Sequence, residues 1–423
     1  MVDSSLVHRA SPWRALAHRN FVCFFVGHGL SLCGTWMQSM AQAWLVYRLT
    51  GSPLLLGVTE FLSRGPILLF APLGGVLADR WPRHRLMILT QSLFMAQATA
   101  LAALTLSGLV TIWWILGLAL AQGLISALEV PTRQTFLTDL VPKRDIPSAI
   151  GMNSSIFNAS RIIGPSIAGV VVSTAGEGYC FLVNAASFLI VLAGLALIRV
   201  KQTRSEHPAG ALGLLREGLS YAWRTPHVRA LLMLASLISI ASMPYATLLP
   251  VFARDILRIG PDGLGWLMAA TGAGALTAAL LLARRSRIQE LGTPIALSVA
   301  GFGVGLLALA SSSILWVSLA ALYAIGFGMV SSLAGCNTLL QSLAPDRMRG
   351  RIVSLYTTAS LGLTVFSSLL AGSGATWFGA PVVVAAGGLL TIGAAAWFWS
   401  VLPAIRPHMH AYKLLPEDEL PAT

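Results

Sequence analysis

Residues 74–85 read Gly-Gly-Val-Leu-Ala-Asp-Arg-Trp-Pro-Arg-His-Arg and separate two hydrophobic stretches that are each long enough to cross a bilayer. Three arginines and a histidine in so short a connection cannot enter hydrocarbon, and such basic loops lie on the cytoplasmic side of membrane proteins. The glycines at the start of the run leave room for two helices to approach closely. This stretch therefore predicts a cytoplasmic turn of a multi-pass membrane protein.

The composition places the whole chain in the same class. Hydrophobic residues make up 56% of the 423 positions and charged residues 10%, whereas soluble domains are about 25% charged. Runs of about 20 apolar residues predict membrane-spanning helices. Twelve such runs occur, at residues 20–44, 53–77, 86–108, 112–136, 149–174, 180–198, 229–251, 263–283, 291–311, 314–338, 350–376 and 380–402. We expect an all-α membrane protein with twelve transmembrane helices in two six-helix halves.

The net charge of +12 follows this topology and needs no nucleic-acid partner. All but five of the 28 lysines and arginines fall in the tails, in connections that follow even-numbered spans, or at the span ends beside those connections. Of the five, Arg48, Arg254 and Arg258 fall on the opposite side, and Arg64 and Arg161 lie inside spans. Because this bias sets orientation, both termini are expected in the cytoplasm. The expected location is a bacterial cytoplasmic (inner) membrane.

The longest polar interruption, residues 200–228, divides the chain into two halves. Within it, Leu212, Leu215, Leu219 and Trp223 recur at helical spacing, which predicts an amphipathic helix on the membrane surface. The predicted organisation is a cytoplasmic tail at 1–19, a six-helix bundle at 20–199, the cytoplasmic linker at 200–228, a second six-helix bundle at 229–402 and a cytoplasmic tail at 403–423.

Sequence patterns for enzymes and cofactors are missing from the chain. The four cysteines have no metal-ligand spacing, and no nucleotide-binding Gly-x-x-x-x-Gly-Lys-Ser/Thr loop occurs. Neither His-Glu-x-x-His nor Gly-x-Ser-x-Gly is present, so a membrane-embedded enzyme is not expected. We expect no catalytic residue, metal or cofactor, and an ion gradient as the energy source. A sensor built on a transporter fold is also disfavoured, because the tails are short.

The Gly-x-x-x-Asp-Arg-x-x-Arg pattern at 75–83 resembles the loop between the second and third helices of major facilitator superfamily transporters. Further blocks resemble one branch of that superfamily, the branch of the enterobactin exporter and the macrolide efflux proteins. These blocks are Arg19-Asn20-Phe21, Leu49-Thr50-Gly51-Ser52, Pro131-Thr132-Arg133-Gln134, residues 158–165 and residues 249–255. The resemblance runs nearly end to end and implies the major facilitator fold and export of a small molecule.

The run Gly164-Pro165-Ser166-Ile167-Ala168-Gly169 resembles the fifth-helix motif of antiporters in this superfamily, with Ala at its second-to-last position. A proline bends a helix and small residues permit tight contact, which together can seal one side of a cavity. Ordinary helix packing would select the same residues. The antiporter interpretation is the favoured one.

Ionisable groups inside spans are costly and are functional candidates by default. Glu60 and Arg64 lie one helical turn apart and can pair, either as a carboxylate that exchanges a proton or as a permanent ion pair. Arg161 has no acid at helical spacing. If Glu60 reaches it, the two arginines and one acid form a site whose charge changes with a single proton; if not, Arg161 binds an anionic group of the cargo or clamps the structure. His28 can titrate near neutral pH, although a lone histidine in an apolar helix is more often packed and hydrogen-bonded. These four residues are the candidates for proton coupling.

The resemblance implies that an acid at Glu129 contacts the arginines of the 79–85 run, while Asp79 faces the start of the eleventh span. The positive end of that helix dipole would favour the Asp79 carboxylate. The residues assigned to gating are Gly75, Asp79, Arg80, Arg83, Glu129, Arg133, Gly164 and Pro165.

Polar and aromatic residues inside spans are candidates to line a central cavity, namely Gln38, Gln42, Gln122, Asn153, Asn158, Tyr245 and Tyr356. Such a mixture suits an amphipathic organic molecule such as a siderophore or a drug. The alternative for each residue is interhelical hydrogen bonding. The expected partners are a small-molecule substrate, a coupling proton and the lipid bilayer, with a monomer as the working unit. Proton-coupled import and transport of a lipid metabolite remain open alternatives.

Overall fold

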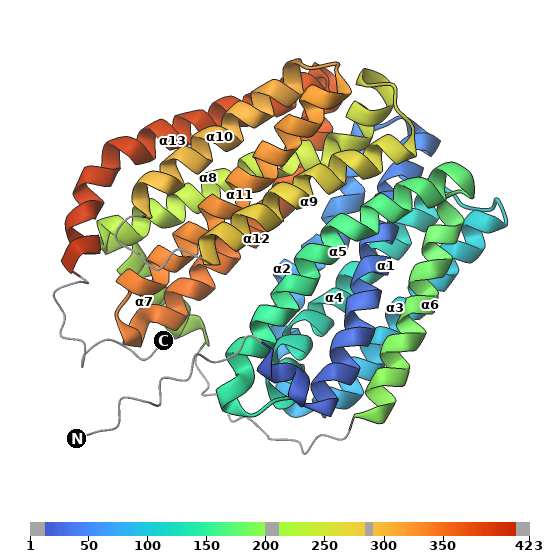
Figure 1. Cartoon of the computed structure of the whole chain (residues 1–423), viewed down its shortest axis with the longest axis horizontal. Coiled ribbons are helices and arrows are strands. Elements are labelled where there is room, and N and C mark those ends of the chain that lie inside the picture. The colour runs from blue at the N-terminus through green and yellow to red at the C-terminus, as the bar shows by residue number, and fades with distance from the viewer. Residues whose placement is uncertain (1–12, 199–210, 284–290, 412–423) are drawn as a thin grey trace. The chain divides into compact units, whose positions relative to one another are not determined.

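A computed structural model describes residues 13–198, 211–283 and 291–411. These residues form helices joined by short turns, with no strand in the described ranges (Figure 1). The long helices are α1 (Arg19–Thr50), α2 (Pro53–Arg80), α3 (Arg83–Leu106), α4 (Ile112–Asp139), α5 (Ile146–Thr174), α6 (Glu177–Leu197), α8 (Pro226–Val251), α9 (Pro261–Ala283), α10 (Gly292–Ser311), α11 (Leu315–Leu343), α12 (Asp346–Phe378) and α13 (Ala380–Ala411). The short elements are η1 (Arg14–Ala17), η2 (Lys143–Asp145), α7 (Ala211–Arg224) and the π-helix η3 (Phe252–Ile256).

Each of the twelve predicted spans matches one long helix; the spans 86–108, 180–198, 291–311 and 314–338 extend one or two residues beyond theirs. Eleven of the described helices are long and apolar enough to cross a membrane. The remaining long helix, α1, runs for 32 residues but carries more polar side chains, among them His28, Gln38 and Gln42. The chain is therefore an all-α, multi-pass membrane protein.

Glycine and proline set the tight turns between consecutive helices. Gly51, between α1 and α2, and Gly379, between α12 and α13, have φ angles of 61° and 82°. Only glycine adopts this left-handed region without steric cost. Pro53 begins α2 at a position where the missing backbone N–H is harmless. These turns reverse the chain within a few residues.

The described chain groups into two compact units. Unit 1 comprises Met1–Gln42 and Leu69–His207, and unit 2 comprises Ala43–Leu68 and Pro208–Thr423. The last turns of α1 and the first half of α2 therefore pack with helices of the second half of the sequence. The predicted division at residues 199 and 229 concerns the same linker and stays a prediction.

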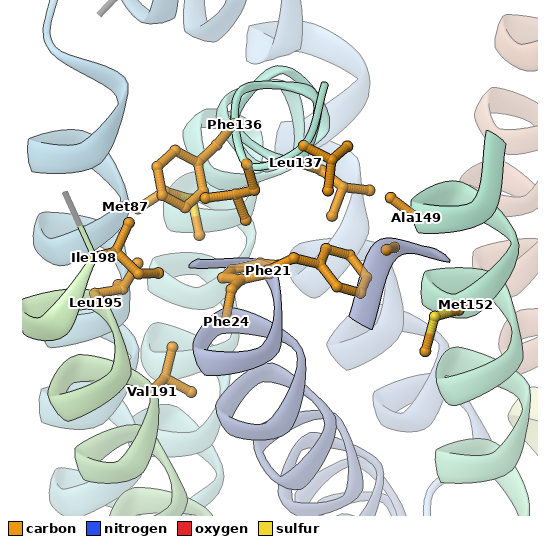
Figure 2. Packing of buried hydrophobic residues seen from close by; sticks show 13 residues of the cluster. Phe21, Phe24, Met87, Phe136, Leu137, Ala149, Met152, Val191, Leu195 and Ile198 are labelled. Carbon is orange, nitrogen blue, oxygen red and sulfur yellow. The ribbon is translucent and has the colours of Figure 1, made fainter. Parts of the chain in front are cut away.

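A hydrophobic cluster fixes the end of unit 1 that carries residues 80–85, called the basic end from here on. Figure 2 shows Phe21 and Phe24 of α1 among side chains from α3, α4, α5 and α6. The ring centroids of Phe24 and Phe136 lie 5.7 Å apart in an edge-to-face arrangement. Burying a side chain of this size removes about 150–250 Å² from solvent. The cluster fixes the first turns of α1, which precede the polar residues His28, Gln38 and Gln42 of the same helix.

The predicted linker helix is present as α7, and it is tied to α12 within unit 2. Arg347 and Arg351 of α12 donate to the two carboxylate oxygens of Glu217, at 2.9 and 2.6 Å. The hydrogen bond from Arg351, followed by that from Arg347, holds the pKa of Glu217 below its usual value. Leu219 and Trp223 remain largely exposed, as an interfacial helix requires. The side chains of Leu212 and Leu215 lie outside the described set.

Candidate functional site

A polar cavity of about 130 Å³ lies inside unit 1, between α1, α3, α4 and α6. Its lining comprises His28, Ser31, Leu32, Thr35, Gln38, Gln91, Phe94, Gln97, Gln122, Ser126, Glu129, Arg133, Asn184 and Phe188. The structure thus brings together five of the residues predicted from the sequence, drawn from all three candidate groups. Sites that enclose drug-sized ligands measure about 300–1,000 Å³, so this cavity holds only a few waters or a small group.

Gln38 is the centre of a hydrogen-bond network across this cavity. Its Nε2 donates to Oε1 of Gln97 at 3.0 Å, and its Oε1 accepts from Nδ2 of Asn184 at 2.8 Å. Gln97 in turn donates to the carbonyl of Leu118 at 3.4 Å. Both ends of the Gln38 amide are used in joining α1 to α3 and α6. Sequence reasoning missed Gln97 and Asn184, although a polar side chain within a span was a usable signal.

Three ionisable groups border the same cavity. Nε of Arg133 donates to Oε1 of Glu129 at 2.8 Å, and Glu129 is 7% exposed. His28 is 5% exposed, and its Nε2 is buried with no hydrogen-bond partner. Its ring stacks on Phe24 with centroids 5.0 Å apart. The predicted i, i+4 pair is present, and the histidine is packed without being hydrogen-bonded at Nε2.

The second predicted pair occurs on α2, in unit 2. Nε of Arg64 donates to Oε1 of Glu60, and the side chains are 45% and 26% exposed. Both residues fall within the apolar part of α2 that satisfies the criteria for a membrane span. A charge at the centre of a bilayer costs about 2.5–3.5 kcal/mol when it contacts lipid. The exposed fraction of this pair therefore has to face protein or a water-filled path.

Arg161 of α5 has an aromatic neighbour in place of an acid. Its guanidinium carbon lies 5.9 Å from the ring centroid of Trp36 in α1. No residue in the described part of the chain forms a hydrogen bond or ion pair with Arg161. Trp36 also meets Phe157 edge-to-face, with centroids 5.9 Å apart.

The fifth-helix motif lies where α5 touches α1. A Cβ on Gly164 would come within 2.6 Å of Cβ of Trp36 and 2.8 Å of the Cys33 carbonyl, so only glycine allows this contact. Pro165 is buried beside it, inside α5. The motif packs two helices together within unit 1, and its role in gating stays a prediction.

At the basic end, the structure pairs Arg83 with Asp139, an acid that sequence reasoning did not select. Nη1 of Arg83 lies 2.9 and 3.1 Å from the two carboxylate oxygens, and both side chains are largely buried. The resemblance had implied Glu129 as the acid for this loop. Asp139 ends α4 and so lies close to the start of α3. Arg80 is exposed, and the side chain of Asp79 lies outside the described set.

Of the two adjacent glycines that predict a close helix contact, only Gly74 makes one. A Cβ on Gly74 would lie 2.2 Å from the carbonyl of Ala127 in α4, whereas one on Gly75 would meet nothing within 4 Å. Successive residues of a helix point about 100° apart, so only one of two adjacent glycines can face the neighbouring helix.

A further polar contact in unit 2 joins the end of α1 to η3. The hydroxyl of Tyr47 donates to the carboxylate of Asp255, and Nη1 of Arg254 donates to the Tyr47 carbonyl at 2.9 Å. The Arg254 guanidinium carbon also lies 5.6 Å from the Tyr47 ring centroid. The wider π-turn of η3 lets both consecutive residues reach Tyr47, and π-turns are frequent at functional sites. Sequence reasoning had noted Arg254 in the charge distribution and Asp255 only within a block of resemblance.

The other residues predicted to contact cargo differ in their burial and in the hydrogen bonds that they form. Asn158 donates to the Ser154 carbonyl of its own helix at 2.8 Å, and Tyr356 donates to the Leu333 carbonyl at 2.8 Å. Tyr245 is 2% exposed and packs edge-to-face on Phe302 in the core of unit 2. The remaining two are Gln42, which is buried, and Asn153, which is half-buried. Within the described ranges, no group of three His, Cys, Asp or Glu residues is placed to hold a metal ion.

Comparison with known families gives one match that spans nearly the whole chain. Residues 10–422 match the model of the transmembrane secretion effector family, a branch of the major facilitator superfamily. Among solved structures, a bacterial homologue of the iron transporter ferroportin in an inward-facing state superposes with a TM-score of 0.66. It is 17% identical and covers 90% of this chain and 98% of its own, which shows the fold alone.

Similar proteins that are named for an activity are transporters. The staphyloferrin A transporter of Staphylococcus aureus is 27% identical over 84% of this chain and 89% of its own length. The multidrug efflux pump Tap of Mycolicibacterium fortuitum is 26% identical, covering 81% of this chain and 87% of its own. The enterobactin exporter EntS of Shigella boydii is 28% identical, covering 89% and 90%. The resemblance read from the sequence blocks is thereby confirmed.

Proposed function

Because this chain belongs to the transmembrane secretion effector family of major facilitator transporters, we propose that it exports an amphipathic organic molecule by alternating access in exchange for protons. The family and the relatives named above are transporters and not enzymes, so the chain is a multi-pass membrane transporter. The direction of transport, the coupling ion and the cargo are the proposed parts.

The relatives support a cargo of siderophore or drug type. Two of them are named for siderophores and one for multidrug efflux. The polar cavity of unit 1 is too small to enclose such a molecule. In this proposal it holds water beside the proton-accepting side chains that line it. The cargo path would lie along side chains that remain half-exposed in a span, such as Asn153, Arg161 and Trp36.

The pair formed by Glu60 and Arg64 carries the proton-exchange proposal. A carboxylate in an apolar span, partly accessible and held by one arginine, has two stable states: ionised and paired, or protonated and released. A change of access that separates the pair would favour protonation, and re-formation of the pair would expel the proton. His28 is the second proton-coupling candidate, because its Nε2 lacks a partner beside the polar cavity.

Two polar contacts support alternating access. Tyr47 with Asp255 would close the side on which α1 ends, and Arg83 with Asp139 would brace the basic end of unit 1. Each contact uses side chains that lose their partners when the helices separate. In this proposal Asp79, Arg80, Glu129 and Arg133 act at the basic end, and Gly164 with Pro165 seals α5 against α1.

The proposed setting is a bacterial inner membrane, with both termini in the cytoplasm and a monomer as the working unit. Exposed tryptophans support a bilayer at both ends of the helices. Trp113 and Trp316 lie at the starts of α4 and α11, Trp377 lies at the end of α12, and Trp81 and Trp223 lie near basic connections. Such aromatic residues are enriched at membrane interfaces.

Substrate-driven proton movement in proteoliposomes tests the proposal. Siderophores and hydrophobic antibiotics would be added to vesicles that hold a pH dye, with wild type compared with E60Q. The matched control is E217Q, which makes the same change outside the membrane. We expect proton flux that follows one class of compound, persists in E217Q and disappears in E60Q. Coupled flux that survives E60Q would transfer the proton role to His28, and cargo movement without proton flux would contradict proton exchange.

A further inference from the structure

The group formed by Arg161, Trp36 and Phe157 has a composition that the proton scheme does not explain. A guanidinium does not release its proton in proteins, so Arg161 is not itself a proton carrier. Its guanidinium carbon lies 5.9 Å from the Trp36 ring, and Phe157 meets that ring edge-on. Phe157 is 43% exposed, while Arg161 and Trp36 are half-buried. The guanidinium of Arg161 thus has an aromatic ring on one side and is partly exposed on another.

The position along α5 restricts what this open side can face. Arg161 lies about 22 Å from the start of α5 at Ile146, in a helix about 43 Å long, and is therefore near its middle. A charge at that depth is costly against lipid, by about 2.5–3.5 kcal/mol on insertion scales and more in simulations. The open side of Arg161 therefore faces a water-filled path through the protein.

The charge of Arg161 is not balanced by its surroundings. The Trp36 ring beside its guanidinium and the Phe157 ring that meets Trp36 carry no formal charge. Glu129, an acid that borders the cavity of unit 1, is paired with Arg133. No described acid pairs with Arg161. A cation on a water-filled path with no counter-ion attracts an anion.

We infer that Arg161, Trp36 and Phe157 form a cargo subsite for an anionic aromatic group, such as an aryl carboxylate or phenolate. The planar fork of a guanidinium matches a carboxylate through two parallel hydrogen bonds. The adjoining aromatic rings offer a face on which an aromatic cargo ring stacks. This inference rests on the proposed function, in which the chain moves an amphipathic organic molecule, and it specifies the charge and ring type of that molecule.

Equilibrium binding to the full-length protein in nanodiscs tests the subsite without requiring transport. The probes are 1-naphthylacetate and its neutral counterpart 1-naphthylacetamide, which share the ring and differ in charge. We expect wild type to prefer the acid, and R161Q to weaken acid binding about tenfold, equal to about 1.4 kcal/mol. Amide binding should change by less than about twofold. The matched control R224Q, an exposed arginine of α7, should leave both affinities unchanged.

Two further variants keep the test decisive if R161Q does not fold. R161K retains the charge but loses the planar fork, so acid binding should weaken and amide binding should not. W36L should weaken both compounds, because stacking on the ring is common to both. Equal affinity of wild type for the acid and the amide, or equal losses for both in R161K, would overturn the inference. Selective binding of the acid without any coupled proton flux would contradict the proposed function and leave the subsite intact.

Discussion

Tyr47, close to the end of α1, donates its hydroxyl proton to the carboxylate of Asp255 in η3, 208 residues further along the chain. Arg254 holds the same tyrosine from its other side, through the backbone carbonyl at 2.9 Å and over the ring. Two consecutive residues that follow α8 thus contact the same tyrosine of α1. In the proposed cycle, these three contacts are released when the transporter opens at this end.

Replacing Tyr47 with Phe should favour opening at this end. The variant removes a hydrogen bond to a charged group, which contributes about 1.5–3 kcal/mol and equals about a tenfold or larger change in population. Spin labels at Gly108 and Ser313, in the α3–α4 and α10–α11 turns, would report the change as a larger long-distance fraction by pulsed electron resonance. The matched control is Y323F, which removes a hydroxyl that bonds Thr277 at 3.1 Å. An unchanged distribution in Y47F would show that the contact does not hold this end closed.

The adjacent glycines of α2 should respond differently to the same substitution. G74A places a Cβ 2.2 Å from the Ala127 carbonyl, so α2 and α4 must separate. Overpacking of this kind costs about 1–3 kcal/mol. G75A meets open space and gains helix propensity, so its stability should equal or exceed that of wild type. Thermal unfolding midpoints in detergent would compare the two variants. An equal loss of stability in both would contradict the observation that Gly74 faces α4 and Gly75 does not.

Replacing Gln38 with Met should destabilise unit 1 even though the side chains are similar in size. The variant leaves Gln97 and Asn184 without partners in a buried site, at a cost of about 1–3 kcal/mol. The matched control is Q341M, because Gln341 is exposed and bonds only Asn337, on its own helix, through its side chain. Its effect should stay within about 0.5 kcal/mol. A comparable fall in unfolding midpoint for both variants would argue against the network as a stabilising feature.

The ion pairs of Glu217 with Arg347 and Arg351, which join α7 to α12, should stabilise the protein to a degree that depends on pH. Two arginines hold the pKa of Glu217 below its usual value, so its contribution to stability is present above the unfolded-state pKa of about 4.3. That contribution is lost as the pH falls through the lower pKa of the folded protein. E217Q should therefore lower the unfolding midpoint near neutral pH, and the gap to wild type should narrow in acid. A difference in unfolding midpoint between wild type and E217Q that widens in acid would contradict this role of Glu217.

Contacts between near neighbours in the chain were readable from the sequence. The pairs of Glu60 with Arg64 and of Glu129 with Arg133 were predicted from their spacing, because four residues make one helical turn. The twelve spans were predicted from length and hydrophobicity alone, because backbone groups in lipid must be satisfied within a helix. These features need no knowledge of which helices are neighbours.

Contacts between distant residues required the tertiary structure. Arg83 pairs with Asp139 rather than with the acid that the resemblance implied, because the end of α4 lies beside the start of α3. Gln38 finds Gln97 and Asn184, and Gly74 rather than Gly75 meets α4, because the rotation of each helix about its axis decides which face is covered. A hydrophobic pattern that is apolar on all sides does not encode that rotation.

The sequence by itself determined that this protein is an all-α membrane transporter of the major facilitator type, where its long helices begin to within a few residues, and which acids and bases share a helical face. Only the tertiary structure decided that Arg161 rests on Trp36 without an acid, that Tyr47 meets Asp255, and that His28 and Glu129 border one cavity. The physical reason is that local geometry follows from the covalent chain and its solvent, whereas partners between helices depend on how their side chains interlock.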